Sequence, residues 1–268
     1  MKQVAIFSVP RSGSTWLGQI FNSHPEVLYR FQPNMAYTFP LTLGTHSTRA
    51  EIESFYKELC KTDDPFTTAR ISVSGKPNPA FNKTTPTTVV FKEVHYIGIV
   101  ENLIRNSGTQ VIGLVRSPLA TLYSWSKAPR EFHPDWDLQK EWMDAPRKNQ
   151  DDPRNYFGYR KWKEVLQFFL RLEKQYPDRF LLLQYERLLA HTEETVENAF
   201  RFCHLEPDPQ TRAFLDQAGS KDERNDTYSV FRTKKDDRAW ETDLPAYIRE
   251  AILGDPAFQG LNKRFQWV

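Results

Sequence analysis

The sequence has little of what would identify several large classes of protein. Its 268 residues include only two cysteines, Cys60 and Cys203, and neither belongs to a CxxC pair or a cluster of metal ligands. We therefore expect two buried thiols in a reducing compartment. Lys and Arg number 36 against 34 Asp and Glu, which leaves a net charge of +2. This balance excludes a global electrostatic field that would attract nucleic acid or an anionic membrane, so any anion must be bound locally.

Long apolar runs and clustered metal ligands are missing as well. No stretch approaches the roughly 18 apolar residues of a membrane-spanning helix, and no signal-peptide pattern follows Met1. The histidines are scattered, and the acidic pairs at 63–64 and 151–152 have no further ligand at a metal-binding spacing. We therefore expect a cytoplasmic protein with no membrane span, no nucleic-acid partner and no metal. The sequence does not indicate an oligomeric state.

Strand-like apolar stretches alternate along the chain with segments of helical periodicity. Strands are expected from about residue 3 to the turn at Pro10, at 88–93, at 110–115 and in a segment ending near Gln184. Helices are expected after the first turn, at 50–61, after His95, after Ser117 as N-cap with Pro118 at the first helical position, at 155–175, and after Thr192 as N-cap. This order predicts one α/β domain over 1–268, in three α/β/α layers around a central parallel sheet. The Pro-rich stretch at 62–88 is expected to form a surface excursion or lid.

The turn between the first strand and the first helix reads Pro-Arg-Ser-Gly-Ser-Thr, from Pro10 to Thr15. Backbone N–H groups at the N-terminus of a helix that follows such a turn bind anions well. A nucleotide triphosphate loop would read GxxxxGK followed by Ser or Thr, but here Ser8 stands at its first Gly and Ser14 at its Lys. Loss of the Lys argues against hydrolysis of ATP or GTP. A cradle led by Arg11 suits a nucleotide whose transferable group is not a phosphoryl group.

Polar side chains follow each of the expected strands. They are Arg11 to Thr15 after the first strand, Lys92, Glu93 and His95 at the second, Arg116 and Ser117 at the third, and Tyr185 and Glu186 at the fourth. Ligands of open parallel sheets bind outside the carboxyl ends of the strands. Groups that bind anions or move protons at every strand end therefore predict one polar site at that edge of the sheet.

The stretch Pro-Arg-Ser-Gly-Ser-Thr-Trp-Leu resembles the 5′-phosphosulfate-binding loop of sulfotransferases that use 3′-phosphoadenosine 5′-phosphosulfate (PAPS). In that family an Arg at a strand end and a Ser eight residues later bind the 3′-phosphate, and Arg116 and Ser124 have this spacing. The stretch Tyr-Glu-Arg-Leu from Tyr185 is similar to the family's Tyr-Glu-Asp-Leu strand end. The resemblance runs in order from Val4 to about Pro207 and implies the P-loop NTPase-like fold of sulfotransferases.

The resemblance also implies a reaction. A sulfuryl group would pass in line from PAPS to a hydroxyl of a small-molecule, carbohydrate or lipid-like acceptor, leaving the bisphosphate PAP, without a metal. Arg11, with the loop N–H groups and hydroxyls, would stabilise charge on the bridging oxygen. The cofactor-binding residues would be Arg11, Ser12, Gly13, Ser14, Thr15, Trp16, Arg116, Ser124 and Tyr185.

Two parts of this assignment leave alternatives open. Trp16 would pack on the adenine with Tyr185 at its edge, but plain core packing is equally compatible with the sequence. Near the C-terminus the family has an Arg-Lys-Gly run, whereas this chain has no Gly there. We carry over Arg232 and Lys234 as 3′-phosphate ligands, with a solvated charged surface as the alternative.

The acceptor hydroxyl needs a base, and the order Lys92-Glu93-Val94-His95 matches neither the Lys-x-His of cytosolic members nor the Glu of several Golgi members. Because an imidazole titrates near neutral pH, His95 is the simpler base. Glu93 would orient His95, or take the role itself when desolvated. Lys92 would contact the sulfuryl group or the acceptor. The alternatives are a Glu–His pair that caps the next helix and a solvated lysine at a strand end.

Two other functions are compatible with such a chain. A small-molecule kinase of the same fold would need the missing loop Lys and an acidic magnesium ligand. A non-catalytic nucleotide-binding relative would keep only the loop, and the presence of Arg11, Arg116 and Ser124 argues against it. The sequence does not identify the acceptor, although aromatic residues at 31–39 and 123–142 are candidates for its pocket.

Overall fold

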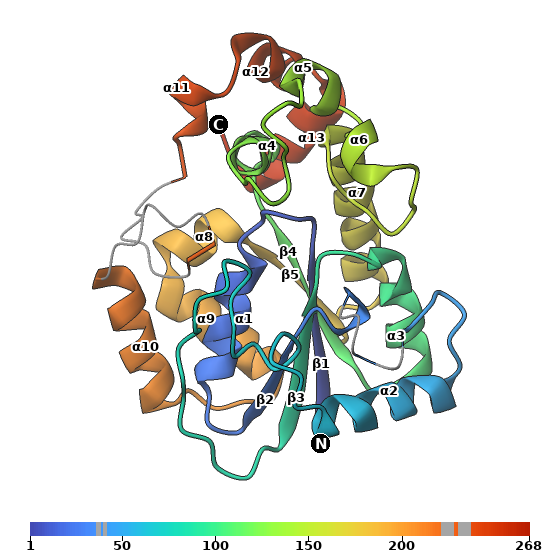
Figure 1. Cartoon of the computed structure of the whole chain (residues 1–268), viewed down its shortest axis with the longest axis vertical. Helices are drawn as coiled ribbons and strands as arrows, with labels where there is room; N and C mark the ends of the chain where they lie inside the picture. The colour runs from blue at the N-terminus through green and yellow to red at the C-terminus, as the bar shows by residue number, and fades with distance from the viewer. Residues whose placement is uncertain (36–38, 40–41, 221–227, 230–236) are drawn as a thin grey trace.

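Five strands form one parallel sheet, in the order β2-β3-β1-β4-β5, in the computed structural model of the chain (Figure 1). The strands are β1 (Lys2–Ser8), β2 (Val27–Phe31), β3 (Thr88–Glu93), β4 (Gln110–Val115) and β5 (Phe180–Gln184). The structure describes residues 1–35, 39, 42–220, 228–229 and 237–268. The central strand is β1, in which Ala5 pairs with Phe91 on one side and Val111 on the other. The parallel sheet and the strands expected from the sequence are confirmed.

The strand β2 is absent from the strands that the sequence analysis predicted. It is five residues long, lies at an edge of the sheet and pairs with β3. A charged residue, Arg30, interrupts its apolar pattern, yet this side chain is 6% exposed. Its guanidinium donates to the carbonyl of Leu59 at 2.5 Å and to that of Tyr29 at 2.9 Å. These hydrogen bonds compensate the cost of burying the Arg30 charge. The same charged residue hides the strand from an analysis of apolar patterns in the sequence.

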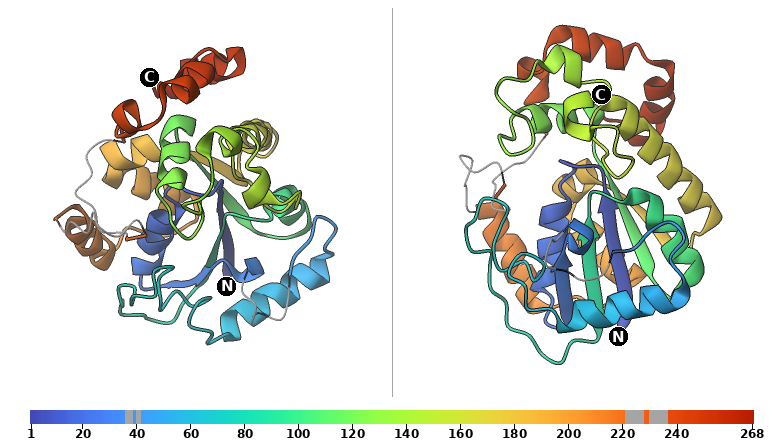
Figure 2. Two further views of the ribbon diagram at one scale, coloured as in Figure 1. Left: turned by 45° about the horizontal axis from the view of Figure 1, so that its top comes forward. Right: turned by 45° about the vertical axis from the view of Figure 1, so that its right-hand side comes forward.

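Helices connect the strands and cover both faces of the sheet (Figures 1 and 2). They are α1 (Ser14–Ser23), α2 (Arg49–Lys61), α3 (Val100–Asn106), α4 (Pro118–Ser126), α5 (Leu138–Glu141), α6 (Pro146–Asn149), α7 (Tyr159–Gln175), α8 (Tyr185–Ala190), α9 (Thr192–Phe202), α10 (Pro209–Ser220), α11 (Trp240–Asp243), α12 (Ala246–Leu253) and α13 (Pro256–Phe265), with short 3-10 helices η1 (Pro33–Met35) and η2 (Ile97–Ile99). Alternation along β1 assigns the layers, because successive side chains point to opposite faces. Val4 and Ile6 pack with α1, α9 and α10, whereas Ala5 and Phe7 pack with α2, α3 and α7. The expected three-layer architecture is confirmed.

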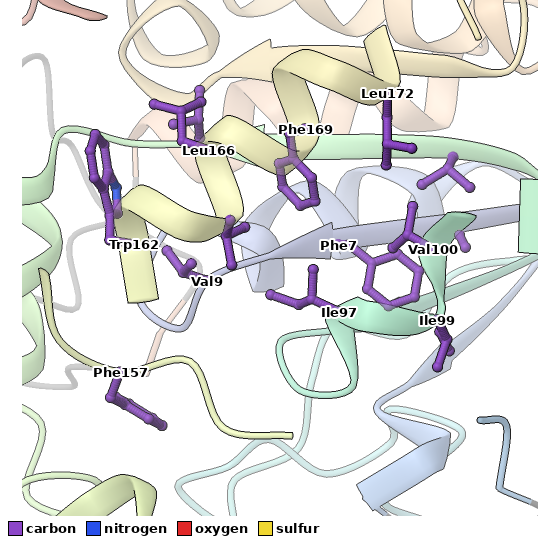
Figure 3. Packing of buried hydrophobic residues seen from close by; sticks show 14 of the residues in the cluster. Phe7, Val9, Ile97, Ile99, Val100, Phe157, Trp162, Leu166, Phe169 and Leu172 are labelled. Carbon is purple, nitrogen blue, oxygen red and sulfur yellow. The ribbon is translucent and has the colours of Figure 1, made fainter. Parts of the chain in front are cut away.

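The face covered by α7 has a core of large apolar side chains. Trp162, Leu166, Phe169 and Leu172 follow one another at helical spacing along α7 and pack over the sheet with Phe7 (Figure 3). Each of the five is at most 3% exposed. This stripe is the amphipathic pattern that predicts the helix, although the helix begins at Tyr159 and not at residue 155.

Two expected helix ends differ in detail from the structure. The helix α4 begins at Pro118 as predicted, but the hydroxyl of Ser117 makes no capping hydrogen bond. Thr192 is the first residue of α9 and not its cap, because its hydroxyl donates back to the carbonyl of Leu188 at 2.9 Å. The excursion at 62–87 contains no helix or strand, only an isolated bridge between Ile71 and Pro77.

The two cysteines are free, and only one of them is buried as expected. Cys203 lies in the core, and burial raises the pKa of its thiol. Cys60 is exposed because Ile52, Tyr56 and Leu59 form the inward face of α2 and the next residue points outward. Over the ranges that the structure describes, no helix combines the length and the apolar character needed to cross a membrane.

The contact between α1 and β2, where Gly18 faces Tyr29, leaves no room for a larger residue. A Cβ atom at Gly18 would lie 2.1 Å from Tyr29 Oη and 2.6 Å from its Cζ, and the Tyr29 side chain is 2% exposed. We predict that Gly18→Ala lowers the free energy of unfolding by about 1–3 kcal/mol, because overpacking outweighs the gain in helix propensity. Denaturant unfolding measures this. Gly260→Ala in α13 is the matched control, since a Cβ there meets nothing within 4 Å, and it should not destabilise. Equal stability of Gly18→Ala and the unmodified protein would contradict the packing.

Candidate active site

The site begins where the backbone turns from β1 into α1. Arg11 and Gly13 have φ angles of +69° and +88°, so the chain passes through two left-handed residues within the turn. The Gly13 carbonyl then accepts hydrogen bonds from the N–H groups of Trp16 and Leu17 at 3.0 and 3.2 Å, which starts the helix. A Cβ atom at residue 13 would lie 2.2 Å from the Tyr185 ring, so close packing also requires glycine there.

The start of α1 presents donors that the protein itself does not satisfy. The helix has no side-chain cap. Among the described residues, the backbone N–H groups of residues 12–15 have no acceptor. The hydroxyl of Ser12 is buried and also lacks a hydrogen-bond partner. Unpaired donors at a helix N-terminus are a binding site for an anion.

The Arg11 side chain extends from this turn toward α4. Its Nε donates to the hydroxyl of Ser124 at 3.3 Å, and its guanidinium lies over the ring of Tyr228, 5.1 Å from the centroid. A carboxylate oxygen of Glu131 is 3.7 Å from Nη1. Arg11 is thus held at the mouth of the turn by groups from several parts of the chain.

Arg116, at the end of β4, is 6% exposed and donates three hydrogen bonds. Its Nη1 donates to the Arg11 carbonyl at 2.6 Å, and its Nε and Nη2 both donate to the carboxylate of Asp237, the latter at 2.6 Å. Burial by itself would lower the pKa of Arg116, but the Asp237 carboxylate raises it above its ordinary value. The sequence analysis expected Arg116 and Ser124 to converge on one phosphate. In the structure each of them contacts Arg11, and a carboxylate occupies the fork of Arg116. Their role as ligands of a phosphate stays a prediction.

A second set of hydrogen bonds fixes the end of β4. The backbone N–H of Ser117 donates to one oxygen of Glu186 at 2.7 Å, and the indole of Trp267 donates to the other at 3.1 Å. The indole of Trp162 donates to the carbonyl of Arg116 at 3.0 Å. Burial raises the pKa of Glu186, and the hydrogen bond from Ser117 partly opposes this. The sequence analysis did not identify either tryptophan, because both lie far along the chain from the strand that they support.

Two aromatic rings stand beside the anion site. Trp16 and Tyr185 form an edge-on pair with centroids 6.2 Å apart and an interplanar angle of 81°. The indole N–H of Trp16 is buried without a hydrogen-bond partner. Both rings line a cavity, so Trp16 is not a purely internal packing residue.

One cavity of about 800 Å³ joins the carboxyl ends of the strands. Residues from every strand end named in the sequence analysis line it, namely Arg11, Gly13, Ser14, Thr15, Trp16, Lys92, His95, Arg116, Ser124 and Tyr185. The excursion at 62–87 contributes Phe66, Ile71 and Val73 to the wall. Arg232 and Lys234 lie outside the described residues. Within those that are described, no group of three or more His, Cys, Asp or Glu is placed to hold a metal ion.

Lys92 and Glu93 are adjacent buried charges at the end of β3. Lys92 is 3% exposed and its ammonium lies 4.5 Å from the centre of the Phe31 ring, at the cavity. Glu93 is fully buried, accepts a hydrogen bond from the backbone N–H of Asn34 at 2.8 Å and does not line the cavity. Burial lowers the pKa of Lys92 and raises that of Glu93, while their mutual attraction opposes both shifts.

His95 lines the cavity on the same side as Lys92. Its Nδ1 lies 2.8 Å from Oδ1 of Asn155, in the segment that leads into α7. Burial lowers the pKa of His95 to about 4, so the imidazole is neutral at pH 7. The sequence analysis expected Glu93 to orient His95 or to act as the base itself. In the structure the imidazole contacts Asn155, and both roles of Glu93 stay predictions.

Comparisons with known proteins agree with this geometry. A family model described as "Sulfotransferase domain" matches residues 1–252. No curated protein sequence is similar enough to count as a match. Identities to solved structures are low, and such likeness shows the fold alone.

Three solved structures illustrate the shared fold. Mouse sulfotransferase SULT7A1 complexed with PAP is 13% identical, with 100% of this chain and 85% of that chain covered and a TM-score of 0.57. The sulfotransferase domain of the Synechococcus PCC 7002 olefin synthase is 15% identical, with 99% and 94% covered and a TM-score of 0.52. Retinol dehydratase in complex with retinol and PAP is 12% identical, with 100% and 82% covered and a TM-score of 0.55.

Proposed function

The chain belongs to the sulfotransferase family, and from this we propose that it transfers a sulfuryl group from PAPS to a hydroxyl of a small-molecule, carbohydrate or lipid-like acceptor by in-line displacement. One observation carries the proposal: a single cavity of about 800 Å³ contains the N-terminus of α1, the guanidinium of Arg11 and the imidazole of His95. An anion site and a neutral base in one cavity are what transfer from a charged donor to a hydroxyl requires.

The residues present fit such a donor. The backbone N–H groups of residues 12–15 and the hydroxyls of Ser14 and Thr15, which line the cavity, would hold the 5′-phosphosulfate. The unpaired indole N–H of Trp16 and the edge of Tyr185 offer polar and aromatic contacts to an adenine. PAPS, when bound, would supply a sulfuryl group joined to a phosphate by an anhydride bond. The turn lacks the lysine of kinase loops, which favours this donor over ATP.

Arg11, Lys92 and His95 would divide the chemistry. Arg11 lies at the turn, where it would stabilise negative charge on the oxygen that bridges phosphate and sulfate. His95, neutral at pH 7, would accept the proton of the acceptor hydroxyl. The ammonium of Lys92 lines the same cavity and would bind an oxygen of the sulfuryl group. Glu93 faces Asn34 and is not assigned a catalytic role.

The binding of the bisphosphate product tests the proposal without an acceptor. We predict that PAP binds the full chain with a dissociation constant in the micromolar range or tighter, and that ATP with magnesium does not match it. Isothermal titration calorimetry measures both. Arg116→Ala should weaken PAP binding, whereas Arg105→Ala, an exposed change on α3, should not. Tight ATP binding with no response to PAP would replace this proposal with a kinase.

The role of Arg11 is tested by turnover once an acceptor has been found by screening. Arg11→Ala should reduce kcat roughly 10²-fold or more, because one preorganised stabiliser of developing charge is lost. The measurement is sulfated product formed from PAPS, with Arg105→Ala as the matched control. Near-normal turnover of Arg11→Ala would remove Arg11 from the chemistry.

Asp237 is an internal anion on the guanidinium that we propose binds the 3′-phosphate. A phosphate that binds the Arg116 fork must take the place of the Asp237 carboxylate. We predict that Asp237→Asn tightens PAP binding roughly tenfold, since Arg116 loses an internal anion that competes for it. Calorimetry measures the affinity, and circular dichroism checks the fold. Asp178→Asn, an exposed change of the same charge, is the control. Unchanged or weaker binding would show that the carboxylate does not compete.

A further inference from the structure

We infer that Asn155 is a positioning residue that fixes the neutral tautomer of His95 with the proton on Nδ1 and the lone pair of Nε2 available in the cavity. The use of that lone pair for sulfuryl transfer rests on the proposed function. The tautomer itself is a property of the folded chain and can be tested separately.

The orientation of the Asn155 amide determines the tautomer. Its Nδ2 donates to the backbone carbonyl of Asn149 at 3.2 Å. A carbonyl oxygen only accepts, so the NH₂ end of the amide must face Asn149 and the oxygen must face His95. The amide oxygen, 2.8 Å from Nδ1, only accepts as well, so Nδ1 of His95 carries the proton. A neutral imidazole has one N–H, and Nε2 is therefore the unprotonated nitrogen.

Asn149 is itself locked in place, so its carbonyl is a stable reference. Asn149 is the last residue of α6 and is 6% exposed. Its Nδ2 donates to the carbonyls of Asp144 and Phe157 at 2.8 and 2.9 Å, and its Oδ1 accepts from the N–H of Phe157 at 3.1 Å. These hydrogen bonds fix the segment between α6 and α7. The segment in turn holds the Asn155 amide with its oxygen against the imidazole of His95.

The surroundings of His95 make the choice of tautomer important. Burial lowers its pKa, and the charges of Lys92 and Lys148 lower it further, while the Asn155 hydrogen bond and Asp152 partly oppose this. The imidazolium form is therefore disfavoured at pH 7, and only the two neutral tautomers compete. Only one of them leaves Nε2 able to accept a proton.

Nε2 is placed to use its lone pair. In the portion of the chain that the structure describes, no residue hydrogen-bonds this nitrogen. His95 lines the same cavity as Arg11 and Lys92, which would contact the donor. A hydroxyl that enters the cavity can therefore meet Nε2, whereas the other tautomer would present an N–H donor to it.

Nitrogen NMR of the full chain, without any ligand, tests the tautomer. With ¹⁵N-labelled histidine, the His95 signals are assigned by their loss in His95→Ala. We expect the Nδ1–H pattern between pH 6 and 8, and a shift toward Nε2–H in Asn155→Ala. Asn155→Asp, nearly the same shape, should keep Nδ1–H and make His95 titrate at higher pH, because a carboxylate stabilises the imidazolium. Asn106→Ala, exposed on α3, should change nothing.

Kinetics with a screened acceptor test the consequence. Asn155→Ala should lower kcat about tenfold with little change in the KM for PAPS. In Asn155→Asp the acidic limb of the kcat profile should move to higher pH, because the base is lost once pH falls below its raised pKa.

Two results would overturn the inference: an Nε2–H pattern in the unmodified protein, or an Asn155→Ala variant with unchanged tautomer and pH profile. The expected tautomer together with full activity of His95→Ala would support the role of Asn155 in fixing the imidazole. That result would overturn the base assignment in the proposed function instead.

Discussion

The site depends first on how the backbone turns between β1 and α1. Two left-handed residues, Arg11 and Gly13, bring the chain from the centre of the sheet directly into a helix. The donors at the helix start therefore point into the cavity without a side-chain cap. A helix N-terminus at the carboxyl edge of a parallel sheet is a ready anion site, and the other strand ends supply the groups that surround it.

Burial of charge is the second constraint on this molecule. Arg116 and Lys92 are almost excluded from solvent, and the protein compensates them with its own groups. The carboxylate of Asp237 meets the guanidinium of Arg116, and the face of Phe31 meets the ammonium of Lys92. The phosphate proposed to bind Arg116 would have to displace Asp237, whereas Phe31 leaves the ammonium of Lys92 at the cavity. These two partners offset the cost of burying the charges of Arg116 and Lys92 in the absence of a ligand.

Much of the fold and part of the site could be read from the sequence because their signals are local. Apolar runs separated by amphipathic helices indicate the parallel sheet, and the turn after β1 has its residues side by side in the chain. The edge strand β2 was missed because Arg30 breaks its pattern and is compensated only by contacts made after folding. Local reading also gave Glu93 the role of orienting the His95 imidazole, whereas in the structure this imidazole contacts Asn155 and the Glu93 side chain accepts a hydrogen bond from Asn34.

The hydrogen-bond partners of Arg116 and His95 come from distant parts of the chain, so no local sequence pattern predicts them. Asp237 is 121 residues from Arg116, and Asn155 is 60 residues from His95. Asp237 precedes α11 and Asn155 lies between α6 and α7, so these groups meet their partners once the chain has folded.

A crystal structure of the full chain with PAP tests the central claim most directly. The account predicts the 5′-phosphate on the backbone N–H groups of residues 12–15, the adenine beside Trp16 and Tyr185, and the 3′-phosphate on Arg116 in place of Asp237. Density for PAP elsewhere on the protein, with the turn after β1 making no contact to a phosphate, would contradict it.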